Sequence, residues 1–243
     1  MKNELELEFR LTVGDLDDKD NITFYSIANL FQEAATIHAE ELNVGYNKMI
    51  EKNLAWIVAR NKITIINNIK PSKIVKVKTW PHPNGRFDFD RDYLLLDENN
   101  NLIAKGTSKW LVYDLNRNFL CSSKGIMEDV NFKEEKNYST KFDKINYGNL
   151  DEFTFVLDYK IQKSDIDHYG HMNNAKYFIL MNNALNIDLR NVYEVQIDYL
   201  NQGYLNDNIK IYQKIINNEY YLIGKKEENI VFAIKVLLAP IEK

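Results

Sequence analysis

The sequence lacks several features that mark particular classes of protein. It has one cysteine, Cys121, in 243 residues, which excludes an intrachain disulfide and a thiolate-rich zinc site. No run approaches the ~18 apolar residues that span a bilayer. The chain begins Met-Lys-Asn-Glu-Leu-Glu, which has no signal-peptide pattern. We therefore expect a cytoplasmic protein with no membrane span.

An excess of positive charge is also absent. Lys and Arg number 31 against 35 Asp and Glu, and the net charge is −4, so no overall basic field would hold a phosphate backbone and nucleic acid is not an expected partner. Only 4 prolines accompany 15 Tyr and 12 Phe, a composition that favours uninterrupted strands. With 45% hydrophobic residues, the chain has ample material for a core.

The chain contains a weak internal repeat. Asp-Leu-Asp at residues 15–17 recurs as Asp-Ile-Asp at 165–167, an offset of 150 residues. Each half opens with apolar residues in strict alternation, which predicts a strand, followed by apolar residues at helical spacing. Four strand-like runs then follow in each half. The predicted strands cover 5–13, 56–66, 74–80, 87–96 and 102–114, then 153–161, 193–200, 209–216, 220–224 and 230–238; the helices lie around 27–38 and 177–185.

This pattern predicts an α+β fold of two tandem domains, each a long helix wrapped by an antiparallel sheet that buries its apolar stripe. We expect the domains at residues 1–115 and 151–243. The residues between them, 116–150, are polar and without periodicity, so we expect a linker, with a short helix near 126–130.

The two halves differ most in the turn before the helix. Residues 165–174 contain His168 and His171, whereas the corresponding residues 15–23 contain no histidine. Asn173 or Asn174 is a suitable N-cap for a helix that begins near Ala175. A helix start offers free amide donors and partial positive charge, and therefore a place for a developing oxyanion.

Asp167 and His171 lie just ahead of that predicted helix. An Asp-oriented histidine could activate a water there, and Gly170 would let a substrate approach the backbone closely. Turn and cap chemistry alone also explains Asp-x-Asp before a helix, and the residues themselves leave both readings open for Asp167 and His171. For Asp165, whose counterpart Asp15 has no histidine nearby, we predict a turn role.

The other candidate groups have simpler interpretations. His168 and His171 could suggest a metal site, but further ligands are missing and we expect no metal or cofactor. His38 lies on the apolar face of the first helix and is predicted to be a core histidine. His82, between two prolines, is predicted to lie in a loop, and Cys121 in the linker is not expected to be a nucleophile.

Residues 165–177, Asp-Ile-Asp-His-Tyr-Gly-His-Met-Asn-Asn-Ala-Lys-Tyr, resemble the signature turn of hotdog-fold thioesterases, and more closely that of acyl-[acyl carrier protein] thioesterases. Blocks at 31–38, 56–60, 79–81, 91–93 and 108–114 resemble the amino-terminal half of the same family, in order, so the resemblance spans about residues 5–240. It implies two fused hotdog domains that hydrolyse a fatty acyl thioester on acyl carrier protein to free fatty acid, with the acyl chain in the first domain. It also implies one catalytic site in the second.

Carried over residue by residue, the resemblance assigns Asp167 and His171 as the catalytic pair, with amides near Asn173 and Asn174 for the oxyanion. Two positions depart from the family pattern: Tyr169 stands where an Asn is usual and Gln202 where a Glu is usual. A glutamine cannot accept a proton as a carboxylate does. Asn183 similarly replaces a frequent acidic residue.

These departures leave alternatives to the acyl-carrier-protein thioesterase open. The chain could bind acyl thioesters with little or no turnover, or it could hydrolyse acyl-coenzyme A instead. An acidic carrier protein would need a local basic patch, for which Lys163, Lys176 and Arg190 are candidates. Because a fused pair supplies both hotdog domains within one chain, the protein is expected to be a monomer or a homodimer.

Overall fold

The computed structural model describes residues 3–67, 73–83 and 85–239, so the first two and last four residues of the predicted domains lie outside the described part. The chain divides into two compact units. The first unit contains the residues up to 61 and from 66 to 141, and the second unit contains residues 62–65 and those from 142 onward. Within the described residues, no helix is both long enough and apolar enough to cross a bilayer.

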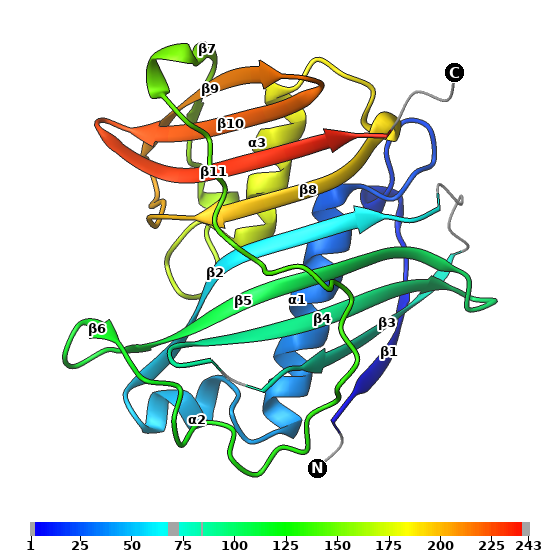
Figure 1. Cartoon of the computed structure of the whole chain (residues 1–243), viewed down its shortest axis with the longest axis vertical. Helices are drawn as coiled ribbons and strands as arrows, with labels where there is room; N and C mark the ends of the chain where they lie inside the picture. The colour runs from blue at the N-terminus through cyan, green and yellow to red at the C-terminus, as the bar shows by residue number, and fades with distance from the viewer. Residues whose placement is uncertain (1–2, 68–72, 84, 240–243) are drawn as a thin grey trace. The chain divides into compact units, whose positions relative to one another are not determined.

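The first unit is a curved sheet around one long helix (Figure 1). The helix α1 (Phe24–Glu41) begins at Thr23, whose side chain accepts a hydrogen bond from the Ser26 amide at 3.1 Å, and packs against β1 and β3. The strand order is β1-β3-β4-β5-β2, with β6 paired to β5. The elements are β1 (Leu5–Arg10), α2 (Tyr46–Glu51), β2 (Leu54–Ile65), β3 (Ile74–Pro81), β4 (Asp88–Asp97), β5 (Leu102–Asp114) and β6 (Phe119–Leu120).

The second unit repeats this arrangement with a shorter helix. Its strand order is β8-β11-β10-β9-β7, and each pair of neighbouring strands is antiparallel. Strand, helix and four strands therefore follow one another in both units, as predicted, and the strand bounds agree with the sequence within a few residues. The elements are β7 (Thr154–Lys160), α3 (Tyr177–Ala184), β8 (Val192–Tyr199), β9 (Asn208–Ile216), β10 (Glu219–Lys226) and β11 (Asn229–Leu238).

The prediction of a long second helix is wrong in its length. The helix α3 has 8 residues against 18 in α1. A single 3-10 turn (Asn174–Lys176) precedes it, and the backbone becomes extended at Leu185. Two asparagines in its last turn, Asn182 and Asn183, favour helix ends over helix interiors. Complete burial of Leu180 and Met181 shows that packing stabilises this short helix.

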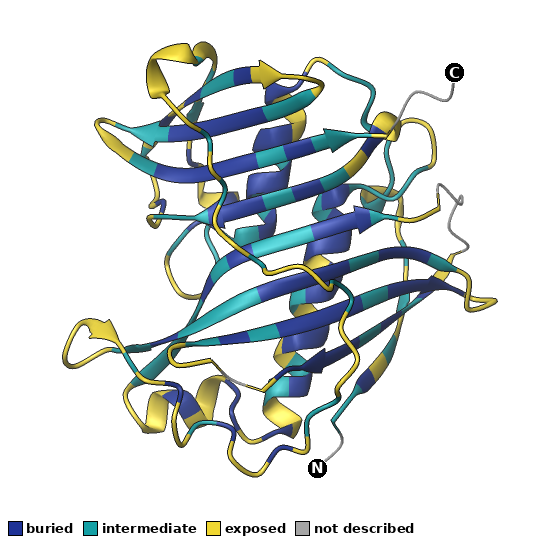
Figure 2. Cartoon of the chain, in the orientation of Figure 1, coloured by how far each residue is buried: buried dark blue, intermediate teal, exposed yellow. Residues whose placement is uncertain are grey.

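Burial alternates as predicted in β3 and β9, whereas β7 has no buried residue and β10 and β11 each bury four consecutive residues (Figure 2). Along β3, for example, Val75, Val77 and Thr79 are fully buried while the intervening lysines are more exposed. In the second unit, Ile209 and Ile211 of β9 are buried in the same way. Period-two patterning therefore placed the core face correctly in these two strands.

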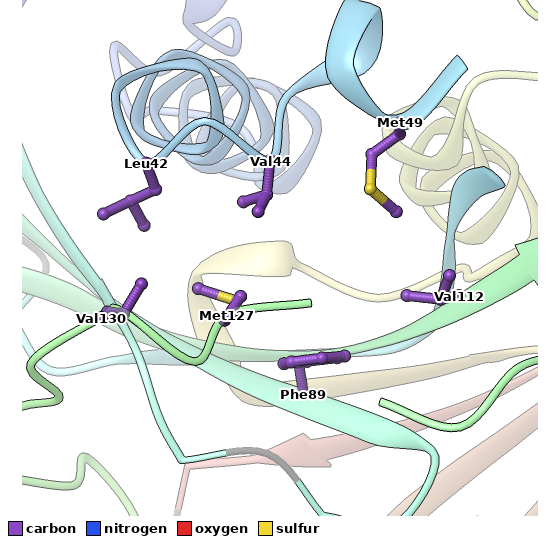
Figure 3. Packing of buried hydrophobic residues seen from close by; sticks show 7 residues of the cluster. All are labelled: Leu42, Val44, Met49, Phe89, Val112, Met127 and Val130. Atoms are coloured by element: carbon purple, nitrogen blue, oxygen red, sulfur yellow. The ribbon is translucent and has the colours of Figure 1, made fainter. Parts of the chain in front are cut away.

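The segment expected as a linker packs on the first unit. Residues 121–141, here called the strap, belong to that unit. Met127 and Val130 are buried in a cluster with five residues of the unit (Figure 3): Leu42, Val44, Met49, Phe89 and Val112. The short helix predicted near 126–130 is wrong, because the structure has turns there. Its apolar residues anchor a loop rather than one face of a helix.

Polar contacts hold the strap further along. The Asn137 side-chain amide donates to the carbonyl oxygens of Tyr93 at 2.8 Å and Gly106 at 2.9 Å, and its backbone amide donates to Asp92 Oδ2 at 2.6 Å. Lys105 Nζ donates to the Asn137 carbonyl oxygen at 2.9 Å. One asparagine thus bridges β4 and β5.

We expect Asn137→Ala to lower the free energy of unfolding by about 1–3 kcal/mol, because two hydrogen bonds of ~0.5–1.5 kcal/mol net each are lost. Urea unfolding followed by circular dichroism measures the change. The exposed Asn131 of the same strap provides the control, and Asn131→Ala should stay within ~0.5 kcal/mol of wild type. Equal midpoints for the two variants would contradict the assigned role of Asn137.

Candidate functional site

The candidate site is the turn that joins β7 to α3 in the second unit. Asp165 closes a 3-10 turn (Lys163–Asp165) at its start. The Asp165 carboxylate is buried and accepts hydrogen bonds from the Tyr159 hydroxyl at 2.6 Å and the Gln162 amide at 2.8 Å. Burial and this contact raise the pKa of Tyr159 to about 12. The predicted turn role of Asp165 is confirmed.

The same turn geometry occurs in the first unit at an offset of 150 residues. The Asp17 amide donates to the Asn21 carbonyl oxygen at 2.8 Å, and the Asp167 amide donates to the His171 carbonyl oxygen at 3.0 Å. Isolated bridges close both turns, one between residues 16 and 22 and one between 166 and 172. Asn21 and His171 therefore occupy equivalent places.

The backbone within each turn is also equivalent. Asp20 and Gly170 both have positive φ, 63° and 83°. The left-handed position of the turn is therefore occupied by glycine in the second unit and by aspartate in the first. Lys19 and Tyr169 donate their amides to Asp17 and Asp167 respectively, each at 2.9 Å. The repeat therefore sets the backbone in both units, and the side chains at 169 and 171 distinguish them.

The residue at the equivalent position changes what the aspartate contacts. In the first unit the Asn21 side-chain amide donates to both Asp17 oxygens, at 3.2 and 3.1 Å. Burial there raises the pKa of Asp17, but the hydrogen bonds from Asn21 and Lys19 outweigh it and the pKa is lowered. Asn21 therefore locks its aspartate into the turn, a contact that a histidine at the same place does not reproduce.

In the second unit the His171 ring contacts Tyr204. The two ring centroids are 5.6 Å apart with the planes at 72°, an edge-to-face arrangement. Among the described residues, no hydrogen bond joins the His171 ring to the Asp167 carboxylate, which instead accepts the Tyr169 amide. Asp167 and His171 are neighbours through their backbones, and orientation of the ring by the carboxylate stays a prediction.

The predicted cap at the helix start is confirmed for one of the two asparagines. Asn173 Oδ1 accepts the Ala175 amide at 2.9 Å, whereas Asn174 lies within the 3-10 turn and its carbonyl oxygen accepts the Tyr199 hydroxyl at 2.9 Å. The Asn173 amide donates to the Asp165 carbonyl oxygen. Among the described residues, neither the Asn174 amide nor the His171 amide donates to an acceptor within the protein.

The two substituted positions lie in different surroundings. Tyr169 is 45% exposed, and its ring contacts that of His168, with centroids 3.8 Å apart and the planes tilted by 39°. Gln202 follows the end of β8, and its Oε1 accepts the Tyr204 hydroxyl at 2.7 Å. Gln202 is thereby linked to His171 through Tyr204, while Tyr169 faces outward. Asn183, the third departure, is exposed on α3.

Sequence reasoning missed Tyr204 and Tyr177. The Tyr177 ring is buried, and burial, partly offset by a hydrogen bond from the Gly203 amide and reinforced by Asp207 and Asp167, raises its pKa well above the usual range. A Cβ at position 203 would lie 2.6 Å from Ile161 Cδ1, so a larger residue there requires the Ile161 side chain to move. The sequence feature that could have indicated Tyr204 is a glycine followed by a tyrosine shortly after the predicted strand 193–200.

The remaining histidines lie in the first unit. His38 is fully buried, with Nδ1 3.0 Å from Arg91 Nη1, which confirms the predicted core histidine. His82 lies in a loop as predicted, yet it is buried, with Nε2 2.9 Å from Asp92 Oδ2. Burial, together with the nearby Asp114, raises the pKa of the Cys121 thiol, which disfavours the nucleophilic thiolate.

The three candidate cations around the turn are not equivalent. Lys163 is exposed and Lys176 is half-buried. Arg190 forms a salt bridge with Asp188, with Nε 3.0 Å from both carboxylate oxygens, so its charge is largely balanced locally. The charge of Arg190 is therefore less available to an acidic partner than its exposure alone suggests.

Comparison with known proteins places this geometry in a family. The sequence profile of the acyl-ACP thioesterase N-terminal domain matches residues 2–129, and that of the acyl-ACP thioesterase C-terminal domain matches residues 148–238. Oleoyl-acyl carrier protein thioesterase 2, chloroplastic, from Arabidopsis thaliana is 30% identical over 175 residues, which cover 64% of this chain and 47% of that protein. The chain spans about half the length of the curated relatives it matches.

Solved structures show the same fold. An acyl-ACP thioesterase from Bacteroides thetaiotaomicron superposes with a TM-score of 0.87 at 21% identity, covering 98% of both chains. The 12:0-ACP thioesterase from Umbellularia californica superposes with a TM-score of 0.82 at 16% identity, covering 99% of both. The two helix-and-sheet units are thus hotdog folds, and the chain belongs to the acyl-ACP thioesterase family.

Proposed function

We propose that this protein hydrolyses the thioester of a fatty acyl chain carried on acyl carrier protein, releasing the fatty acid and the carrier thiol. The observation that carries the proposal is the asymmetry of the repeat: two equivalent turns, of which only the second has a histidine, His171, beside an aspartate at a helix start. Family membership supports acyl-ACP as the substrate class.

In the proposed reaction a water molecule attacks the thioester carbonyl carbon while His171 accepts one of its protons. The Asn174 amide, which has no acceptor among the described residues, donates to the developing oxyanion. The carbon–sulfur bond then breaks, and the imidazolium returns the proton to the departing carrier thiolate. Asp167, in the same turn, stabilises the imidazolium by its charge. No covalent enzyme intermediate forms.

Two further parts of the proposal concern the substrate. The first unit would hold the acyl chain among its apolar side chains, and Lys163 and Lys176 would attract the acidic carrier protein. Gln202 cannot serve as a general base because an amide does not take up a proton near neutral pH. We therefore assign it a hydrogen-bonding role and leave proton transfer to His171.

The purified wild-type chain is expected to release free fatty acid from acyl carrier protein loaded with medium or long acyl chains. Mass spectrometry of the released acid measures the rate without interference from Cys121. The same acyl chains on coenzyme A form the control, and kcat/KM should be lower on coenzyme A because that carrier lacks a protein surface for Lys163 and Lys176. Equal rates on both carriers would favour an acyl-coenzyme A thioesterase.

A second candidate is a protein that binds acyl thioesters without turnover. It is favoured by the Gln202 amide, which replaces a carboxylate and is bonded to Tyr204, and by Tyr169, which points outward where an asparagine is usual. Lipid that copurifies with a chain lacking hydrolysis on every carrier would support it.

If the second candidate is correct, the double substitution Tyr169→Asn with Gln202→Glu should create hydrolysis, because it restores a carboxylate able to accept a proton. General-base assistance contributes ~10²- to 10⁴-fold. Release of free fatty acid above the uncatalysed rate measures the gain. Each single substitution is the control. If the double variant is as inactive as the wild-type chain, the residues at 169 and 202 are not the cause of the inactivity.

A further inference from the structure

We propose that Tyr204 is a positioning residue that fixes both the His171 ring and the orientation of the Gln202 amide. The inference rests on the proposed function, since positioning matters for catalysis only if His171 acts on a thioester. Tyr204 is the residue that contacts both groups: its ring packs edge-to-face on His171 and its hydroxyl donates to Gln202 Oε1.

Tyr204 can act in this way because its own backbone is held firmly. The Tyr204 amide donates to Asp207 Oδ2 at 2.9 Å, and the Asp207 amide donates back to the Tyr204 carbonyl oxygen at 3.0 Å. Lys226 Nζ binds the same carboxylate at 2.8 Å and lies 5.9 Å from the centroid of the Tyr204 ring. Two hydrogen bonds to Ile161 then fasten this turn to the residue after β7.

A separate set of contacts joins Tyr204 to the turn that carries His171. The Gly203 carbonyl oxygen accepts the Met172 amide at 2.8 Å, and the Gly203 amide donates to the Tyr177 hydroxyl. Met172 follows His171 directly, so one backbone hydrogen bond sets the distance between the histidine and residues 202–204. A side chain at position 203 would press on Ile161 Cδ1 and the Tyr177 hydroxyl, so the small residue favours this close approach.

The contact with Gln202 decides which end of its amide is available. An amide has one oxygen acceptor and two N–H donors. The Tyr204 hydroxyl occupies the oxygen at 2.7 Å, so the NH2 group is the end that Gln202 presents elsewhere. A donor in this place binds an oxygen, either the attacking water or the thioester carbonyl. Tyr204 thus gives Gln202 a defined part in a site where a carboxylate is usual.

The contact with His171 limits the rotation of the imidazole. An edge-to-face aromatic pair is expected to favour one ring orientation about 2- to 10-fold. Since the Asp167 carboxylate accepts the Tyr169 amide, Tyr204 is the side chain that the structure places against the His171 ring. Both functional contacts of Tyr204 therefore act on orientation rather than on proton transfer.

Tyr204→Phe and Tyr204→Leu separate the two contacts. Phenylalanine keeps the ring and removes the hydroxyl, so kcat should fall about 5- to 10-fold with KM little changed, the loss expected for one hydrogen bond of ~1 kcal/mol. Leucine also removes the ring contact and should lower kcat further. The control is Tyr193→Phe, an exposed tyrosine of β8, which should leave kcat and KM unchanged.

A double-mutant cycle tests whether the hydroxyl acts through Gln202. In a Gln202→Leu background, Tyr204→Phe should lower kcat by less than 2-fold, because the contact is already lost. Equal effects of Tyr204→Phe in both backgrounds would overturn the proposal.

Nuclear magnetic resonance separates this proposal from the proposed function, because it needs no turnover. In the unliganded protein, Tyr204→Phe should move the side-chain amide signals of Gln202 and leave the ring signals of His171 in place, whereas Tyr204→Leu should move both. Unmoved Gln202 signals in Tyr204→Phe would refute the positioning role. An inactive wild-type chain with the expected shifts would refute the proposed function alone.

Discussion

The substitution His171→Ala is expected to lower kcat for the hydrolysis of acyl-[acyl carrier protein] by ~10²- to 10⁴-fold, the contribution of a positioned general base. The loss should fall on kcat rather than KM, because the imidazole takes part in proton transfer and adds little to binding of the acyl chain. The variant should fold normally, because the His171 side chain is only partly buried and its ring contacts Tyr204 near the surface. Steady-state release of free fatty acid measures the effect.

The chain offers a matched control for this experiment. His168 lies three residues earlier in the same turn, is exposed, and contacts Tyr169 rather than Tyr204. His168→Ala should therefore keep kcat within about 2-fold of wild type, as expected for a side chain outside the proton-transfer path. A similar loss in both variants would indicate a general disturbance of the turn, and an unchanged rate in His171→Ala would exclude the proposed base.

The local structure around the site was predictable from the sequence because turn chemistry is local. In both copies of Asp-x-Asp the second aspartate accepts the amide two residues on, and a residue with positive φ, Asp20 or Gly170, follows one position later. Short polar side chains that bond to nearby amides need no distant partner to form such turns. The cap by Asn173 was predictable for the same reason.

Features that depend on distant residues were not predictable. The strap has no periodicity, yet Met127 and Val130 complete a core cluster whose other members come from four separate elements or loops of the first unit. The stability of the 8-residue helix α3 likewise depends on the packing of Leu180 and Met181, because so short a helix is marginal on its own. Tertiary packing therefore overrode the local pattern in both places.

The candidate site shows the same division between local and distant effects. His171 and Asp167 could be selected from the sequence because one copy of the repeat has a histidine and the other does not. The arrangement of His171, Tyr204 and Gln202 could not, because residues 171 and 204 are far apart in the sequence and are brought together by folding, where Met172 donates to Gly203. The orientation of an amide by a tyrosine hydroxyl leaves no periodic trace in a sequence.

The second large effect concerns Trp80, which secures the strap. The substitution Trp80→Ala should lower the free energy of unfolding of the first unit by about 3–5 kcal/mol, the usual cost of truncating a buried aromatic side chain to alanine. The Trp80 ring is fully buried at the end of β3, and Nε1 donates to the Glu135 carbonyl oxygen at 2.9 Å. Lys133 Nζ lies 4.2 Å from its ring centroid. Urea unfolding followed by circular dichroism measures the loss.

Trp80→Phe separates packing from attachment of the strap. Phenylalanine retains most of the buried apolar area but cannot donate to Glu135, so we expect a smaller loss of about 1–2 kcal/mol. Both variants should expose Lys133 and Lys136 to trypsin sooner than wild type, because each loses the hydrogen bond that holds the strap to β3. If cleavage accelerates only in Trp80→Ala, apolar packing rather than the hydrogen bond holds residues 121–141 on the first unit. Release of the strap should then occur only when the core of the first unit is destabilised.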